Sequence, residues 1–278
     1  MKRRIIVDSC CDLTQEMRDE MEIVTIPLTM MLGDREYRDD ETLDIAGFIS
    51  KVSEFKGKSE SASPAPFFYE QAIADCDEAY VVTLSAKLSG SYFNAVLGND
   101  DAVEGGSQSA CIFDSKTASA GETLIAVKLH ELIRADTPRE IIIETMHRFV
   151  DEMKTYFVLE RFDNLQKNGR LSKVTGTLIQ MLNVKLIMGA DGQGEIALFE
   201  KCRGMKHMLQ QMLSLIERSG KEPRDGTLVI SHCNNPGLAQ QIRTLVQESF
   251  YFKKIYIVPT GGLSSMYVDN KGLVLAFG

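Results

Sequence analysis

The residues best suited to chemistry lie in the segment 84–95, which reads LSAKLSGSYFNA. The preceding residues 79–84 are apolar and β-branched, which is typical of a strand buried on both faces of a sheet. A helix is expected to begin near Ser89 or Gly90. Ser89, Gly90 and Ser91 would then bring together two hydroxyl groups, free backbone N–H groups and the positive end of a helix. This arrangement predicts an anion site, although a serine N-cap followed by a packing glycine explains the same residues.

Catalysis by Ser89 would require a general base, and the chain contains four histidines. Three of them lie on predicted amphipathic helices, and only His232 follows a predicted strand at its carboxyl end. The segment around Ser89 also lacks the GxSxG turn of a hydrolase. A serine-dependent lipid hydrolase or acyltransferase therefore remains the alternative rather than the favoured reading.

Other kinds of site have little support in the sequence. Neither GxGxxG nor GxxxxGK[ST] occurs, so no nucleotide cofactor is expected. The six cysteines form no CxxC pair, which argues against a zinc site or a disulfide framework and favours buried free thiols. Asp8 and Asp12 follow the first strand and could bind a metal or cap a helix. Without a third oxygen-rich partner in the sequence, capping is expected.

Length and charge restrict the class of protein further. The chain has 278 residues, of which 44% are hydrophobic and 25% charged, as in an ordinary globular protein. Its formal charge of −8 and the lack of a basic stretch argue against binding to nucleic acid. No apolar run reaches the roughly 18 residues of a membrane span, and no signal-peptide core follows Met1. A cytoplasmic protein with only transient membrane contact is expected.

Strands and helices are predicted to alternate along the chain. The strands are expected at 4–7, 23–32 with a bend at Pro27, 79–85, 110–114, 156–159, 184–189, 195–201, 227–231, 255–258 and 273–277. The helices are expected at 13–21, 44–55, from 65, 90–98, 118–134, 138–153, 165–169, 174–182, 205–219 and 237–249. This order predicts an α/β fold with a mostly parallel sheet in an N-terminal lobe, 1–155, and a second α/β lobe, 156–278. The polar segment 56–66 is read equally well as a linker or as a functional loop.

Two arginines complete the set of candidate residues. Arg170 and Arg203 each lie beside a glycine at the end of a predicted element. They suggest a ligand head group held mainly by neutral donors, with positive charge near the mouth of the site. The apolar residues 178–182 would suit an adaptable pocket, and ordinary core packing explains them equally well.

An ordered set of motifs now makes the chain recognisable. The motifs are Asp8-Ser9 with Asp12-Leu13, SASPAP at 61–66, LSGSYFNA at 88–95, Asp114-Ser115, LQKNGR at 165–170 and Lys201-Cys202-Arg203. In this order and over nearly the whole length, the chain resembles the DegV family of bacterial fatty-acid-binding proteins, which includes the FakB subunits of fatty acid kinase.

The resemblance implies a two-lobed α/β fold with one long-chain fatty acid in a tunnel between the lobes, such as palmitate, stearate or oleate. It implies that the carboxylate is bound by loop hydroxyls and that a separate kinase subunit phosphorylates the acid. No catalytic residue, cofactor or metal is implied. The family's positions that bind the carboxylate or face the kinase correspond here to Ser61, Ser63, Ser89, Ser91, Asn94, Arg170 and Arg203.

The chain departs from the family at two places. Ala62 and Ala65 stand where hydroxyl residues are usual, so fewer donors remain in that loop. Near the C-terminus, Tyr267 and the residues after it occupy the place of a His-Thr-Gly-Pro-Gly stretch whose histidine joins the carboxylate network. A tyrosine hydroxyl can also donate to a carboxylate, and His232 is a second candidate for this role. These departures leave open a third reading, a carrier of another anionic amphiphile.

Overall fold

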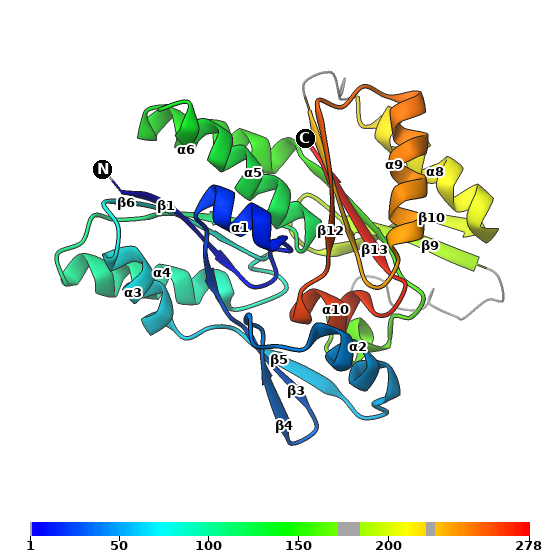
Figure 1. Ribbon diagram of the computed structural model, residues 1–278, viewed down its shortest axis with the longest axis horizontal. Coiled ribbons are helices and arrows are strands. Elements are labelled where there is room, and N and C mark those ends of the chain that lie inside the picture. The colour runs from blue at the N-terminus through cyan, green and yellow to red at the C-terminus, as the bar shows by residue number, and fades with distance from the viewer. Residues whose placement is uncertain (1, 172–183, 221–225) are drawn as a thin grey trace.

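The computed structural model describes residues 2–171, 184–220 and 226–278 (Figure 1). Its strands are β1 (Arg3–Asp8), β2 (Val24–Ile26), β3 (Thr29–Leu32), β4 (Arg35–Arg38), β5 (Ser59–Ala62), β6 (Glu78–Thr83), β7 (Cys111–Asp114), β8 (Lys154–Val158), β9 (Val184–Ala190), β10 (Ile196–Arg203), β11 (Thr227–His232), β12 (Lys254–Pro259) and β13 (Leu273–Phe277). Its helices are α1 (Gln15–Met21), α2 (Ile45–Glu54), α3 (Pro66–Ala74), α4 (Ser91–Glu104), α5 (Ala120–Arg134), α6 (Arg139–Glu152), α7 (Asp163–Lys167), α8 (Gly204–Arg218), α9 (Pro236–Ser249) and α10 (Gly262–Val268). The predicted helix 174–182 lies outside the described residues.

The N-terminal part of the chain forms a parallel sheet of four strands in the order β2-β1-β6-β7. Alternate residues of its strands enter cores on opposite faces, as the pleat of a strand requires. Ile6 packs with side chains of α3 and α4, while Ile5 and Val7 pack with α1, α5 and α6. The parallel sheet predicted from the buried apolar strands is confirmed.

A second, three-stranded antiparallel sheet has the order β4-β3-β5. Two expectations are corrected here. The predicted bent strand 23–32 is two strands in different sheets, because Pro27 lies between β2 and β3 and lacks the N–H needed to continue a ladder. The segment 56–66 is not a linker, since β5 pairs with β3 and carries Ser61 opposite Met30.

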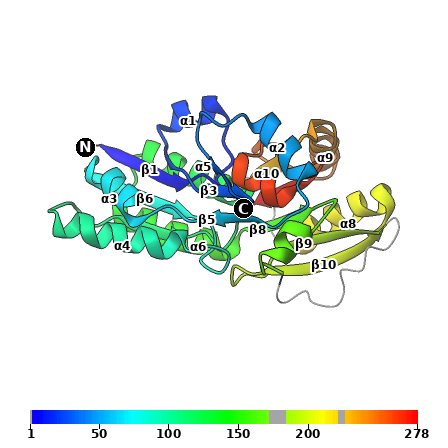
Figure 2. The ribbon, with the colours of Figure 1, turned by 90° about the horizontal axis from the view of Figure 1, so that it is seen from below.

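The C-terminal part forms a mixed sheet of six strands in the order β10-β9-β8-β13-β11-β12. Helices α8 and α9 cover one face, where Met208, Met212 and Ile242 enter a core with Leu228 and Leu275. Methionine at helical spacing is thus part of the core. Figure 2 shows α3 and α4 at one end of the molecule and the β9–β10 hairpin at the other.

Helix α5 lies between the parallel sheet and the six-stranded sheet, and contacts β1 and β6 of the first and β8, β11 and β13 of the second. Its side chains Leu124, Ile125 and Leu129 are fully buried because they are enclosed on both sides. The two sheets therefore share one large core, and the division into lobes near residue 155 stays a prediction.

Helix α10 was not anticipated in the sequence. Its residues GLSSMYV mix glycine and serine with apolar side chains, so they lack a helical period. It packs against α2 and α7, which returns the end of the chain to the N-terminal half (Figure 1). Helix α4 also differs from expectation, since it extends to Glu104 rather than ending near residue 98.

Candidate functional site

An apolar cavity lies where β5, the segment after β6, the start of α5, β8 and α10 meet. Aliphatic and aromatic side chains from both halves of the chain form most of its wall. They are Leu28, Leu84, Leu88, Phe157, Leu159, Leu165, Ile196, Leu263, Val268 and Val274. Such a cavity suits a largely apolar ligand whose few polar atoms are bound at fixed points.

The cavity follows one face of β8. Phe157 and Leu159 point into it together with Thr155, since residues two apart in a strand share a face. The intervening Tyr156 and Val158 point to the other side and pack with α8. Thr155 and Leu159 are separated by roughly 13 Å of extended chain at about 3.3 Å per residue, so the cavity lining reaches along the whole of this segment.

Polar groups gather at the Leu159 side of this cavity, where α7, β5 and α10 meet. Ser61, Ser89, Arg170 and Tyr267 all line it there. The Ser61 and Tyr267 hydroxyl oxygens are 2.9 Å apart and share a hydrogen bond. Burial raises the pKa of Tyr267, so its phenol remains protonated and able to donate a hydrogen bond.

Arg170 follows Gly169, whose positive φ of 72° ends α7. Its Nε donates to the Leu88 carbonyl oxygen at 3.0 Å, and its Nη1 donates to the Asn168 carbonyl oxygen. Both partners are neutral, and within the described ranges no carboxylate pairs with this guanidinium. Carbonyl oxygens orient the guanidinium without neutralising it, so Arg170 favours a bound anion at the cavity.

The predicted hydroxyl turn is present but is partly engaged in its own bonds. The Ser91 N–H donates to the Ser89 oxygen at 3.2 Å, and the two hydroxyl oxygens are 3.1 Å apart. Ser91 is fully buried and does not line the cavity, so Ser89 is the member of the turn that faces it. The expected free N–H group of Ser91 is therefore occupied.

Gly90 permits a close approach between two loops. A Cβ atom at Gly90 would lie 3.1 Å from the Ser63 oxygen. The Asn94 amide nitrogen donates to this oxygen at 3.0 Å and to the Pro64 carbonyl oxygen at 2.8 Å. Since both of its N–H groups have partners, Asn94 braces the start of α3 against α4, and neither Asn94 nor Ser63 lines the cavity.

Two predicted residues lie apart from this group. Arg203 is exposed at the start of α8, where its backbone N–H donates to Nδ1 of His207. His232 ends β11, pairs with Pro259 and Leu273, and has its pKa lowered by burial. Neither of the two lines the cavity.

Helix α10 places Tyr267, and distant side chains fix both of its ends. Asp12 accepts a hydrogen bond from the Gly261 N–H at 2.8 Å, and Asp39 accepts from the Gly262 and Leu263 N–H groups at 2.8 and 2.9 Å. At the other end, Arg161 forms a two-point ion pair with Asp269. These contacts span up to 249 residues of sequence, which is why no local pattern revealed them.

Of the two carboxylates expected to cap a helix, Asp12 binds the Gly261 N–H at the start of α10, whereas the cap of the following helix α1 is Thr14. Asp8 instead accepts hydrogen bonds from the Cys10 and Leu84 N–H groups at 3.1 and 2.9 Å. Leu84 begins the segment that leads to Ser89, so a buried carboxylate fixes the start of that segment. Burial raises the pKa of Asp8 and of Asp12 to about 6.

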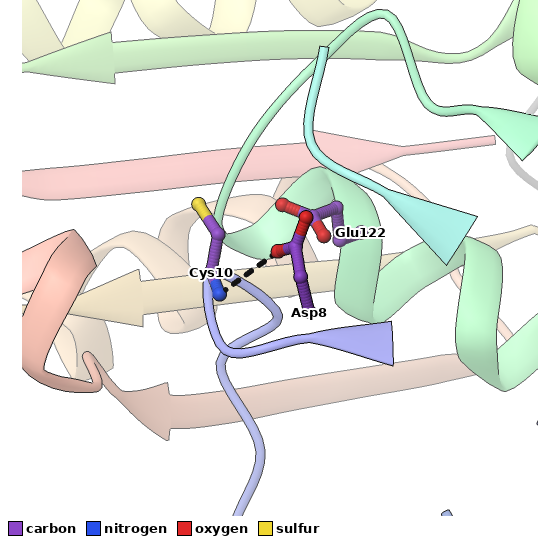
Figure 3. Close-up of side chains that lie close together, drawn as sticks. All are labelled: Asp8, Cys10 and Glu122. Carbon is purple, nitrogen blue, oxygen red and sulfur yellow. Dashed lines mark hydrogen bonds between the residues drawn. The ribbon is translucent and has the colours of Figure 1, made fainter. Parts of the chain in front are cut away.

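A second buried carboxyl group faces Asp8. Glu122 is fully buried in α5 and points toward Asp8 and Cys10 (Figure 3). A carboxylate oxygen of Glu122, a carboxylate oxygen of Asp8 and Sγ of Cys10 all lie within 4.8 Å of one another. Neither Glu122 oxygen has a hydrogen-bond partner in the described part of the chain. Burial, followed by the charge of Asp8, raises the pKa of Glu122 well above its usual range. Two carboxyl groups this close in an apolar surrounding cannot both be ionised, so the pair holds a proton at neutral pH.

The cysteines agree with the expectation of free thiols. All six are free, and five of them are buried, Cys76 being the partly exposed one. No helix among the described residues is both long and apolar enough to cross a membrane.

Fold and site together define an α/β protein with an apolar cavity that has serine, tyrosine and arginine side chains at one end. The family model for DegV proteins matches residues 2–277. A DegV domain-containing protein of Streptococcus pneumoniae strain R6 is 32% identical over 280 residues, covering 100% of this chain and 99% of the relative. This chain therefore belongs to the DegV family.

Solved structures that are similar to the whole chain include the following two. A DegV family protein from Ruminococcus gnavus, with vaccenic acid, has a TM-score of 0.94 and 37% sequence identity, and 99% of each chain is covered. The Streptococcus pneumoniae fatty acid kinase B3 protein, loaded with linoleic acid, has a TM-score of 0.91 and 30% identity, covering 100% of this chain and 99% of that one.

Proposed function

We propose that this protein binds one long-chain fatty acid, with its acyl chain in the apolar cavity and its carboxylate at the polar end. The observation that carries the proposal is the guanidinium of Arg170, which lies without a described acidic partner at the end of an apolar cavity. Membership of a family whose relatives hold vaccenic and linoleic acids supports the same ligand class.

The energetics are compatible with tight binding. Each buried CH₂ group contributes about 0.8 kcal/mol, so a long acyl chain gains on the order of ten kcal/mol before the costs of ordering. A carboxylate must then find partners, because an unpaired charge in apolar surroundings is very costly. The hydroxyls of Ser61, Ser89 and Tyr267 supply neutral donors, and Arg170 supplies the charge.

Identification of the ligand tests this proposal. Freshly purified protein should show one bound molecule by native mass spectrometry, and denaturing extraction should release a long-chain fatty acid. Exchange with added palmitic, stearic and oleic acids should follow. A protein that is empty and also takes up none of these acids would contradict the proposal, whereas release of a different anionic amphiphile would favour the third reading.

The geometry gives little support to a serine hydrolase. The Ser89 hydroxyl lies beside Ser91, and no histidine lines the cavity in the part of the chain that is described. A nucleophile without a base within reach is poorly activated. A Ser89→Ala variant should therefore bind the fatty acid more weakly than the wild type. The wild-type protein should hydrolyse no acyl ester, so the variant should show no loss of esterase activity.

We further propose that the bound acid is presented to a separate kinase subunit, which forms the acyl phosphate in the cytoplasm, where nucleoside triphosphate is available. The similarity to the B3 protein of a fatty acid kinase supports this step. Exposed Arg203 is a candidate for contact with the kinase. Phosphorylation of the bound acid by a purified fatty acid kinase subunit, with the Arg203→Ala variant for comparison, tests the proposal.

A further inference from the structure

The cavity also has polar groups at the Thr155 side of the β8 face that it follows. Thr155 begins the β8 face that the cavity follows, and Thr117 comes from the segment between β7 and α5. The Thr117 hydroxyl donates to the Thr155 hydroxyl oxygen at 2.8 Å, and both residues are buried. A hydrogen-bonded pair of hydroxyls therefore closes the cavity at this side.

This pair lies between two hollows of the molecule. A second, more polar groove lies beyond it, lined among others by Asp151 and Arg218. The cavity and the groove have Lys116, Thr117, Thr155 and Ala190 in common. The groove begins where the cavity ends, and the threonine pair lies at the boundary.

Thr117 is held in place by neighbours on several sides. Its carbonyl oxygen accepts from the Ser85 N–H at 2.8 Å, and its N–H donates to the Ser115 oxygen at 3.2 Å. Its methyl group lies 2.3 Å from the position that a Cβ atom would occupy at Gly121, so the side chain fits against a bare glycine backbone. Thr117 cannot move aside without disturbing the start of α5.

We propose that the hydrogen-bonded pair Thr117–Thr155 is the chain-length stop of the cavity, which sets the longest fatty acid that the protein accepts. The inference rests on the proposed function, since it assumes that the carboxylate binds at the Arg170 end. A methyl end that passed the pair would have to separate the two hydroxyls, and an alkyl chain offers no hydrogen bond in place of the one that is lost. Acyl chains that end before the pair are accepted, and longer ones are excluded.

The test measures which acid the protein selects from a mixture. Wild-type protein and variants are exchanged with an equimolar excess of palmitic, stearic, arachidic and behenic acids, and the retained acids are extracted and quantified. In Thr155→Ala the ratio of arachidic to stearic acid should rise by roughly tenfold or more, the factor expected from two further buried CH₂ groups. Thr155→Val keeps the bulk of the side chain but loses the hydrogen bond to Thr117, so it should retain more arachidic acid than the wild type and less than Thr155→Ala. Thr227→Ala, which lines neither hollow, is the matched control.

A filling variant keeps the inference falsifiable if Thr155→Ala does not fold. Thr155→Leu should shift selection toward palmitic acid and away from stearic acid. Unchanged selection in a folded Thr155→Ala or Thr155→Leu protein that still binds stearic acid would overturn the chain-length stop alone. A wild-type protein that retains none of the four acids would instead overturn the proposed function.

Discussion

The hydrogen bond between Ser61 and Tyr267 gives the sharpest test of how the carboxylate is bound. Because Tyr267 stays protonated, its hydroxyl can donate to the ligand while its oxygen accepts from Ser61. A hydrogen bond to a charged group contributes about 1.5–3 kcal/mol. Tyr267→Phe should therefore weaken fatty acid binding by about ten- to a hundredfold.

The assay is displacement of a fluorescent fatty acid by the unlabelled acid and by a long-chain alcohol of the same length. The alcohol fills the cavity but carries no negative charge, so Tyr267→Phe should affect it much less than the acid. Tyr251→Phe, at a residue that is 68% exposed, serves as the matched control. The Ser61→Ala variant and the double variant complete a cycle, in which the two losses should not add because the hydroxyls bind one another.

Two results would refute this reasoning. If acid and alcohol lose affinity equally, Tyr267 shapes the cavity and does not bind the head group. If neither changes, the carboxylate lies elsewhere, and the departure of this chain from the family histidine carries no consequence for binding.

Three further expectations follow from the structure. In a displacement assay, Arg170→Ala should weaken fatty acid binding by about tenfold or more. Arg203→Ala should leave binding unchanged because Arg203 lies outside the cavity. Equal losses of affinity in the two variants would contradict the placement of both residues. Asn94→Ala should lower the free energy of unfolding by about 1–3 kcal/mol in urea titration, since the Pro64 carbonyl loses its partner, and an unchanged midpoint would contradict the bracing role. Burial raises the pKa of Glu122 well above its usual range and that of Asp8 from 3.8 to about 6. The folded state therefore holds more protons than the unfolded state, and the free energy of unfolding should fall as pH rises through about 6 and beyond. Glu122→Gln remains neutral and should reduce that fall in urea titrations from roughly pH 5 to pH 8; a slope as steep as the wild type's would show that Glu122 is not protonated in the folded protein.

The sequence predicted the features that short-range patterns encode. Buried β-branched strands such as β6, the amphipathic helix α2 and the glycine that ends α7 each depend on neighbours within a few residues. The strand-and-helix order then led to a parallel N-terminal sheet, and the ordered motifs led to the family. The hydroxyl turn around Ser89 was located correctly as the start of α4.

The contacts that sequence reasoning missed join residues far apart in the chain. Glu122 reads as an ordinary exposed residue in the first turn of a helix, yet the second sheet covers α5 and leaves it buried beside Asp8. The family resemblance implied that Asn94 is a ligand donor, but its amide N–H groups already donate to Ser63 and Pro64. The sequence shows which side chains could bind a ligand. Only the packed structure shows which of them are not already hydrogen-bonded to other parts of the protein.

The position of Tyr267 depends on this long-range packing more than on its own segment. Asp12 and Asp39 hold the first turn of α10, and Arg161 holds its end through Asp269. The buried carboxylates and the ion pair thus act on the head-group site indirectly, by fixing the helix that carries the tyrosine. A substitution at Asp39 would therefore displace the phenol without touching the ligand, and its effect on acid binding should be accompanied by a loss of stability, whereas Tyr267→Phe should lower affinity with little change in stability.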